Sequence, residues 1–89
     1  MERVHIFVYG KVQMVNFRYY IKEKADKLNL KGWIKNNEDG SVEAVFEGQE
    51  KNINDITKFC KKGPSSAKVN IIKITEEKPE NLQEFKIIR

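Results

Sequence analysis

The segment from residue 3 to residue 9 alternates between two kinds of side chain. Aliphatic residues fall on one side of this alternation and ring-bearing residues on the other, namely Val4, Ile6 and Val8 against His5, Phe7 and Tyr9. A period of two predicts a β-strand over residues 3–9 that ends at Gly10. Because neither side of this strand is strongly polar, we expect a central strand with a neighbour at each edge.

Two later segments carry apolar residues at intervals of three or four. The first stripe is Phe17, Ile21, Ala25 and Leu28, and the second is Ile53, Ile56, Phe59 and Cys60. Such spacing places one apolar face along a helix, so we expect one helix from Phe17 onward and a second after Gly48. The second helix should end at Gly63, because glycine followed by proline is typical of a helix C-terminus.

The remaining apolar segments predict further strands. Residues 32–35 and 41–47 flank a polar run whose Asp39-Gly40 pair is a strong signal for the turn of a β-hairpin. Towards the end of the chain we expect a strand over 69–75, a loop over 76–81 and a short final strand over 84–88.

The predicted order is strand, helix, strand, strand, helix, strand, followed by the short final strand. In a chain of 89 residues this order predicts a single domain, residues 1–89, of the α+β class. The compact solution is a ferredoxin-like split βαβ sandwich, in which two helices pack on one face of an antiparallel sheet. Proteins with this fold have many unrelated functions, so the fold leaves the function open.

The amino-acid composition limits both the cellular location and the catalytic mechanisms that we expect. Apolar residues make up 39% of the chain and charged residues 34%, and no apolar run approaches the roughly 20 residues that span a bilayer. A single cysteine, Cys60, excludes an internal disulfide, and one cysteine with one histidine, His5, cannot form a structural zinc site. The same counts exclude the usual Ser-His-Asp and Cys-His mechanisms unless His5 lies at the site. We expect a cytoplasmic protein with no membrane partner.

The connection between the first strand and the first helix is the best candidate for chemistry. Its backbone N–H groups should converge with the unsatisfied N–H groups of the first helical turn, where an anion can bind. Arg18 at the helix entrance adds planar donors that can grip a phosphoryl or carboxylate group with two hydrogen bonds. A plain connection with a surface arginine would have the same spacing, and neither the P-loop nor the Rossmann glycine pattern is present.

Two gapped motifs follow one another along the chain. The first consists of Val8, Gly10, Val12, Gln13, Val15, Phe17 and Arg18. The second consists of Gly32, Trp33, Ile34, Lys35, Asn36, Gly40, Val42 and Gly48. In residue types, order and spacing these motifs resemble the two signatures of the acylphosphatase family, and the resemblance covers essentially the whole chain.

The resemblance implies hydrolysis of an acyl phosphate, a carboxylic-phosphoric mixed anhydride, to a carboxylate and inorganic phosphate. It implies a phosphate-binding loop formed by Gln13, Met14, Val15, Asn16, Phe17 and Arg18. In the family the loop N–H groups and the arginine, here Arg18, bind the phosphoryl group, and the asparagine, here Asn36, orients the attacking water. No metal and no cofactor are implied. The expected partners are therefore a small-molecule acyl phosphate and its product phosphate, and we expect a monomer.

Physical chemistry agrees with this assignment. A carboxylate is a good leaving group with a low proton affinity, so no side chain has to protonate it and no histidine is required. A carboxamide such as that of Asn36 both donates and accepts hydrogen bonds, yet adds no negative charge beside the anionic phosphoryl group.

Met14 departs from the family pattern, which has Gly or, less often, His at this position. If the loop needs a positive φ there, a residue with a Cβ costs about 1–2 kcal/mol and can misalign the N–H groups. We expect the fold to survive and the activity to be reduced rather than lost.

Two alternatives to an enzyme stay open. The first is an anion-binding module of the same fold that Met14 has made catalytically inert. The second is an RNA-binding domain that uses the formal net charge of +4, although the lysines are interspersed with acids and no segment matches the aromatic RNA-binding motif. We therefore expect no nucleic-acid partner. Other notable residues have structural explanations: His5 packed or partly exposed, Cys60 in the core, and Asn37 and Asp39 in the turn.

Overall fold

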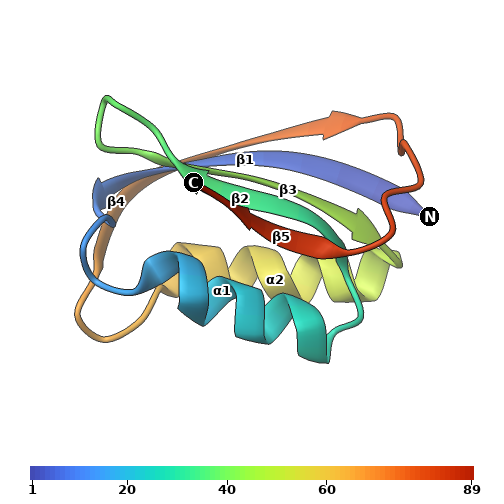
Figure 1. The fold of residues 1–89 in the computed structure, drawn as a ribbon, viewed down its shortest axis with the longest axis horizontal. Coiled ribbons are helices and arrows are strands. Elements are labelled where there is room, and N and C mark those ends of the chain that lie inside the picture. The colour runs from blue at the N-terminus through green and yellow to red at the C-terminus, as the bar shows by residue number, and fades with distance from the viewer.

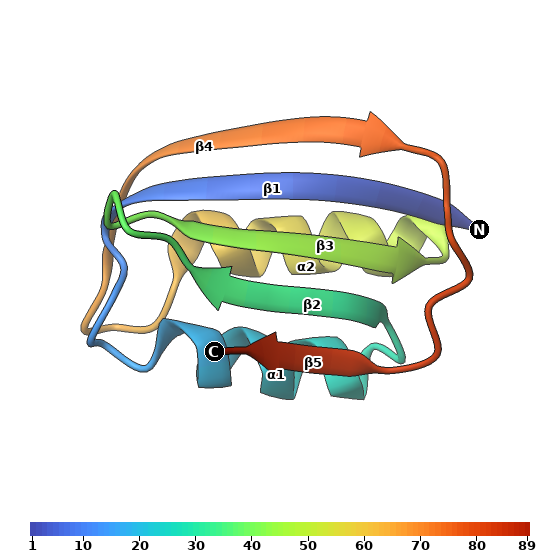
Figure 2. The same ribbon diagram turned by 45° about the horizontal axis from the view of Figure 1, so that its top comes forward.

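The computed structural model describes all residues 1–89 as two layers, a five-stranded sheet and two helices that cover one of its faces (Figure 1). In chain order the elements are β1 (Glu2–Lys11), α1 (Phe17–Lys27), β2 (Lys31–Asn36), β3 (Val42–Gly48), α2 (Glu50–Lys62), β4 (Lys68–Glu77) and β5 (Phe85–Ile88). The strands lie side by side in the order β4-β1-β3-β2-β5 (Figure 2). The predicted α+β, ferredoxin-like split βαβ fold is confirmed. Neither helix is long and apolar enough to cross a membrane.

The sheet departs from the expected antiparallel arrangement at one edge. Strand β5 runs parallel to β2, whereas all other neighbours are antiparallel. Figure 2 shows the reason: β4 ends at the same end of the sheet where β2 begins, and the connection to β5 crosses that end. Strand β5 therefore starts beside the start of β2 and points in the same direction.

The core lies between the helices and one face of the sheet. Strand β1 is central, as predicted, and its Val4, Ile6 and Val8 are at most 5% exposed. They pack with the buried stripes of the two helices, namely Phe17, Ile21 and Ala25 of α1 and Ile53, Ile56 and Cys60 of α2. Burial of this apolar surface holds the two layers together. The core positions predicted for Phe17 and Cys60 are confirmed.

Several element boundaries differ by one or two residues from the sequence expectation, and two of these differences have a clear physical cause. Strand β1 continues past Gly10 to Lys11, because Gly10 forms an irregularity in the pairing with β4. A side chain there would place a Cβ 2.2 Å from the carbonyl oxygen of Lys68, and Gly10 has a φ of 137°.

The loop expected to begin at Glu76 begins later, so that prediction is wrong at its first two residues. Glu76 and Glu77 extend β4, and Glu77 is the register partner of Arg3 in β1. The Arg3 Nε atom donates a 2.9 Å hydrogen bond to Oε1 of Glu77. Pairing with β1 thus keeps a polar segment in the sheet despite its low strand propensity.

Candidate functional site

Residues 12–16 connect β1 to α1 and are held at both ends of the connection by hydrogen bonds. The Gln13 side-chain amide donates to the carbonyl oxygens of Asn37 (2.7 Å) and Ser41 (2.9 Å) in the β2–β3 turn. On the other side, the Ser66 hydroxyl donates to the carbonyl of Val15 at 3.1 Å. The connection is therefore fixed to the β2–β3 turn and to the segment between α2 and β4.

Two residues of this connection have a left-handed backbone conformation. Met14 and Asn16 both have a φ of 61°. Asparagine tolerates this conformation better than other residues with a side chain, whereas for methionine it costs about 1–2 kcal/mol. The sequence left open whether the loop needs a positive φ at Met14, and the structure shows that it does. The side chain itself causes no crowding, because Met14 is 100% exposed.

The backbone N–H groups of residues 14–19 form a continuous run without acceptors in the protein. None of them donates to a backbone carbonyl or a side chain, and the first N–H with a partner is that of Tyr20, which donates to Asn16 O at 3.0 Å. The first turn of α1 accounts for part of this run, because the first N–H groups of any helix lack intrahelical acceptors. The dipole of the helix adds positive potential at the same place.

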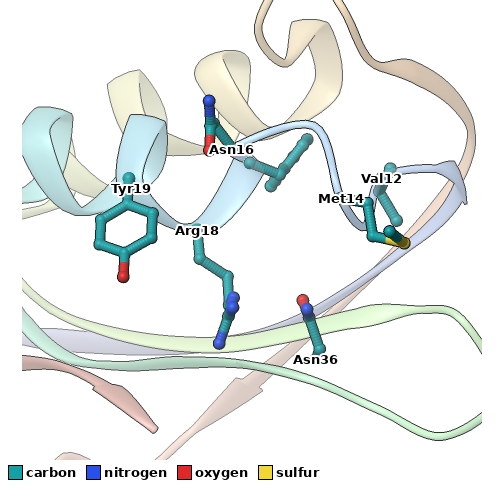
Figure 3. A pocket seen from close by; sticks show the side chains of 7 residues that line it. Val12, Met14, Asn16, Arg18, Tyr19 and Asn36 are labelled. Carbon is teal, nitrogen blue, oxygen red and sulfur yellow. The ribbon is translucent and has the colours of Figure 1, made fainter. Parts of the chain in front are cut away.

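A small pocket lies in front of these N–H groups, between the start of α1 and the end of β2. Its volume is about 80 Å³, and it is lined by Val12, Met14, Asn16, Phe17, Arg18, Tyr19 and Asn36. In Figure 3 the Arg18 side chain descends from α1 and that of Asn36 rises from β2 toward the same space. Pockets for organic ligands commonly measure about 300–1,000 Å³, so this one suits a small group rather than a whole organic molecule.

The predicted site residues separate into two sets. Five of them line the pocket, namely Met14, Asn16, Phe17, Arg18 and Asn36. The first four come from the β1–α1 connection and the start of α1, whereas Asn36 is the last residue of β2. Gln13 and Val15 do not line it. The amide of Gln13 is bonded to the β2–β3 turn, and Val15 is buried in the hydrophobic core.

The charges around the pocket favour an anion. Arg18 forms no ion pair with any carboxylate, and no acidic side chain or histidine lines the pocket. Opposite it, Oδ1 of Asn36 is buried without a hydrogen-bond partner. A buried polar atom without a partner costs about 1–3 kcal/mol, and such atoms in native structures are often functional.

The β2–β3 turn, which follows Asn36 directly, is held together by its own hydrogen bonds. Oδ1 of Asp39 accepts from the backbone N–H of Ser41 (2.9 Å) and from its hydroxyl (2.6 Å), which lowers the pKa of the Asp39 carboxyl below its ordinary value. Nδ2 of Asn37 donates to Oγ of Ser41 at 3.1 Å. The structural roles expected for Asn37 and Asp39 in the turn are confirmed.

Sequence reasoning missed two residues of the pocket: Val12, which belongs to the first motif but not to the predicted loop, and Tyr19. Tyr19 follows Arg18 directly, but the helical stripe assigns it to the outer side of α1, and it is 49% exposed. Its one visible signal in the sequence is its position beside Arg18.

The partly exposed position expected for His5 is confirmed. His5 lies away from the pocket on the open face of the sheet, where its ring nitrogens are 2.6 Å from Glu43 and 2.8 Å from Glu77.

Free N–H groups, an unpaired guanidinium and a carboxamide around a small pocket form a candidate binding site for a small oxyanion on an α+β sandwich. Comparison with known proteins gives the family. The acylphosphatase family model matches residues 4–87. The chain therefore belongs to the acylphosphatase family.

Individual relatives agree with this assignment. An acylphosphatase of Trichormus variabilis is 44% identical over 87 residues, which are 98% of this chain and 86% of that protein. The crystal structure of acylphosphatase from Bacillus subtilis superposes with a TM-score of 0.97 at 39% identity and covers 100% of both chains. Full-length HypF also contains a similar segment, with a TM-score of 0.92 and 31% identity over 99% of this chain but only 12% of HypF. Domains of this family thus occur both alone and within larger proteins.

Proposed function

We propose that this protein hydrolyses small-molecule acyl phosphates to a carboxylate and inorganic phosphate, with Arg18 and Asn36 as its catalytic residues. The observation that carries the proposal is the pairing across one small pocket of an unpaired guanidinium and a buried amide oxygen without a partner. A phosphoryl group offers negative oxygens to the guanidinium, and a separate water molecule can donate a hydrogen bond to the amide oxygen.

The phosphoryl group would be bound by the loop of residues 13–18. Its oxygens accept hydrogen bonds from the free backbone N–H groups, and the planar Arg18 side chain contributes two parallel donors. These donors are already in place before the reaction, so little reorganisation is needed as charge develops on the equatorial oxygens. The side chains of Gln13 and Val15 do not line the pocket, and their role is to hold the loop in position.

Asn36 would position the attacking water. The water donates one hydrogen to Oδ1, which directs an oxygen lone pair toward phosphorus. The new bond forms between the water oxygen and phosphorus, and the bond between phosphorus and the acyl oxygen breaks. The electron pair leaves with the carboxylate, and the water proton passes to a phosphoryl oxygen, since no carboxylate or imidazole lines the pocket.

Kinetics of two variants with benzoyl phosphate test these roles. Arg18→Ala should abolish turnover and raise the inhibition constant of inorganic phosphate by at least about tenfold, because two charge-assisted hydrogen bonds are lost. Asn36→Ala should lose turnover while phosphate still inhibits at nearly its original concentration. Near-normal rates in both variants would show that the site lies elsewhere.

An inert anion-binding module is the second candidate function, and the left-handed Met14 in the loop is the observation that favours it. Such a module would bind phosphate in an Arg18-dependent manner and show no turnover. Phosphate binding measured by calorimetry beside the benzoyl phosphate assay separates the two functions.

We further propose that residues 1–89 act as one domain, as a cytoplasmic monomer without nucleic-acid partners. A single core cluster joins both helices to the sheet, and the lone cysteine is consistent with a reducing compartment. The open face of the sheet carries the carboxylates Glu43 and Glu77 beside its aromatic residues, which opposes binding of a polyanion. Light scattering after gel filtration tests the monomer, and an RNA titration at low salt tests the last point.

A further inference from the structure

A second arginine without an ion pair, Arg89, contacts a residue that lines the pocket. Nη2 of Arg89 donates a 2.6 Å hydrogen bond to Oη of Tyr19, and the guanidinium carbon lies 5.8 Å from the centre of the Tyr19 ring. This geometry combines a hydrogen bond with a cation–π contact. Tyr19 lines the pocket next to Arg18, so the Arg89 cation is held against a residue of the site itself.

The parallel direction of β5 brings Arg89 to this place. In the β2–β5 pair, Ile88 is the register partner of Lys35. The residues that follow them, Arg89 and Asn36, are therefore carried to the same end of the sheet. Figure 1 shows this end of the chain beside the end of β2, above the first turn of α1. An antiparallel final strand would have placed the arginine at the opposite end.

Arg89 and Tyr19 retain unused hydrogen-bonding capacity. Arg89 forms no ion pair with a carboxylate, and its guanidinium has five N–H donors of which one is bound to Tyr19. The Tyr19 hydroxyl accepts that bond, and its own O–H donates to no group of the protein. Both side chains can meet a ligand, since Tyr19 is 49% exposed and Arg89 is exposed as well.

The pocket itself holds only the phosphoryl end of a substrate. Its volume of about 80 Å³ leaves the acyl part outside, over the rim that Tyr19 forms. A positive group with free donors at this rim attracts an acyl part that carries its own negative charge. Arg18 is then occupied by the phosphoryl group and Arg89 by the distant anionic group.

We propose that Arg89, supported by Tyr19, is a specificity-determining residue that favours acyl phosphates whose acyl group bears a second anionic group, such as a carboxylate. This inference rests on the proposed function, because it concerns the acyl side of the same substrate. Arg89 contacts the substrate far from phosphorus and equally before and during the reaction, so its contribution belongs to KM and not to kcat.

Matched benzoyl phosphates test the proposal. Benzoyl phosphates with a carboxylate at the ring position meta or para to the acyl group are compared with the corresponding carbamoyl compounds, which have the same shape and no charge. We measure kcat/KM for the carboxylate over the carbamoyl compound in the wild type, Arg89→Gln and Lys86→Gln. Lys86 is the matched control, because it is an exposed cation on the same strand, 3.5 Å from Glu84 and away from the pocket lining.

Arg89→Gln should lower this ratio about two- to fivefold for at least one ring position, the range measured for exposed ion pairs, with the loss in KM. Lys86→Gln should leave the ratio as in the wild type. High salt should lower the wild-type ratio more than that of Arg89→Gln, because the interaction is screened.

If Arg89 has a purely structural role, such as holding Tyr19, its substitution would lower kcat/KM for both substrates alike and keep their ratio constant. An unchanged ratio in Arg89→Gln at both ring positions therefore overturns the inference while benzoyl phosphate turnover still supports the proposed function. If the wild type hydrolyses neither benzoyl phosphate nor its derivatives, the proposed function fails and the inference fails with it.

Discussion

Nε2 of Gln13 lies 2.9 Å from the carbonyl oxygen of Ser41, and this hydrogen bond joins the loop that carries Arg18 to the hairpin that carries Asn36. The two catalytic candidates lie on different elements, α1 and β2, so their separation depends on such links. We therefore predict that Gln13 is a positioning residue, one that acts on the site through the turn it binds.

Gln13→Glu tests this positioning. The substitution preserves shape but replaces two N–H donors with a carboxylate that faces the carbonyls of Asn37 and Ser41. We expect kcat to fall about 10- to 100-fold, since displacements near 1 Å have effects of this size. Inhibition by phosphate should change much less, because the loop N–H groups and Arg18 remain on one segment. A kcat within twofold of the wild type would contradict the role.

Residue 14 offers a graded test of backbone strain. Glycine adopts a φ of 61° freely, asparagine tolerates it and methionine does so at a cost of about 1–2 kcal/mol. We expect kcat/KM to increase in the order Met14, Met14→Asn, Met14→Gly, by up to about tenfold in total, because each step favours the loop conformation that binds phosphate. Steady-state kinetics with benzoyl phosphate measure the series. A slower glycine variant would mean that the exposed methionine side chain assists the reaction.

The Arg3–Glu47 pair should dominate the acid stability of the fold. Glu47 is 0% exposed, and its carboxylate accepts from Nη1 of Arg3 (2.8 Å) and from the backbone N–H groups of Glu80 (2.7 Å) and Leu82 (3.0 Å). Burial alone would raise the pKa of Glu47, but these three donors outweigh it and hold the pKa below its ordinary value. A lowered folded-state pKa stabilises the protein above the unfolded pKa, about 4.3, and this stabilisation is lost as pH falls through the folded value.

Glu47→Gln should therefore lower the free energy of unfolding at neutral pH by about 3 kcal/mol, because it leaves the buried Arg3 charge with less compensation. The difference from the wild type should shrink as pH falls from the unfolded value of about 4.3 through the lowered folded value, because the wild-type carboxylate then becomes protonated as well. Urea unfolding at several pH values measures both effects. Glu84→Gln, which removes an exposed pair with Lys86, is the control and should change stability by less than about 1 kcal/mol. Equal effects of the two substitutions would refute the assignment.

Cys60 should be unreactive in the folded protein. It is 1% exposed, and burial raises the pKa of its thiol to about 12, so almost no thiolate is present at mildly alkaline pH. We expect no labelling by a disulfide reagent in buffer and one equivalent per chain in denaturant. Rapid labelling of the native protein would mean that helix α2 opens locally far more easily than its packing indicates.

Sequence periodicity predicted the elements well because it records local burial. The alternation around Ile6 and the helical stripe through Ile21 each describe which side chains leave water, and the structure buries both residues completely. It failed at Glu77, where a partner strand and Arg3 keep a polar residue in β4. Local propensity contains no information about such a distant partner.

For the candidate site, the sequence by itself determined the chemistry and the tertiary structure decided the geometry. The motifs around Arg18 and Asn36 indicated a phosphoryl site and the residue types that serve it, because the chemistry of an anion restricts which side chains can bind it. Three relationships follow from strand order and direction: Gln13 binds the β2–β3 turn, Tyr19 lines the pocket, and Arg89 contacts Tyr19. Those relationships join residues up to 70 positions apart, and only packing of the whole chain brings such residues together.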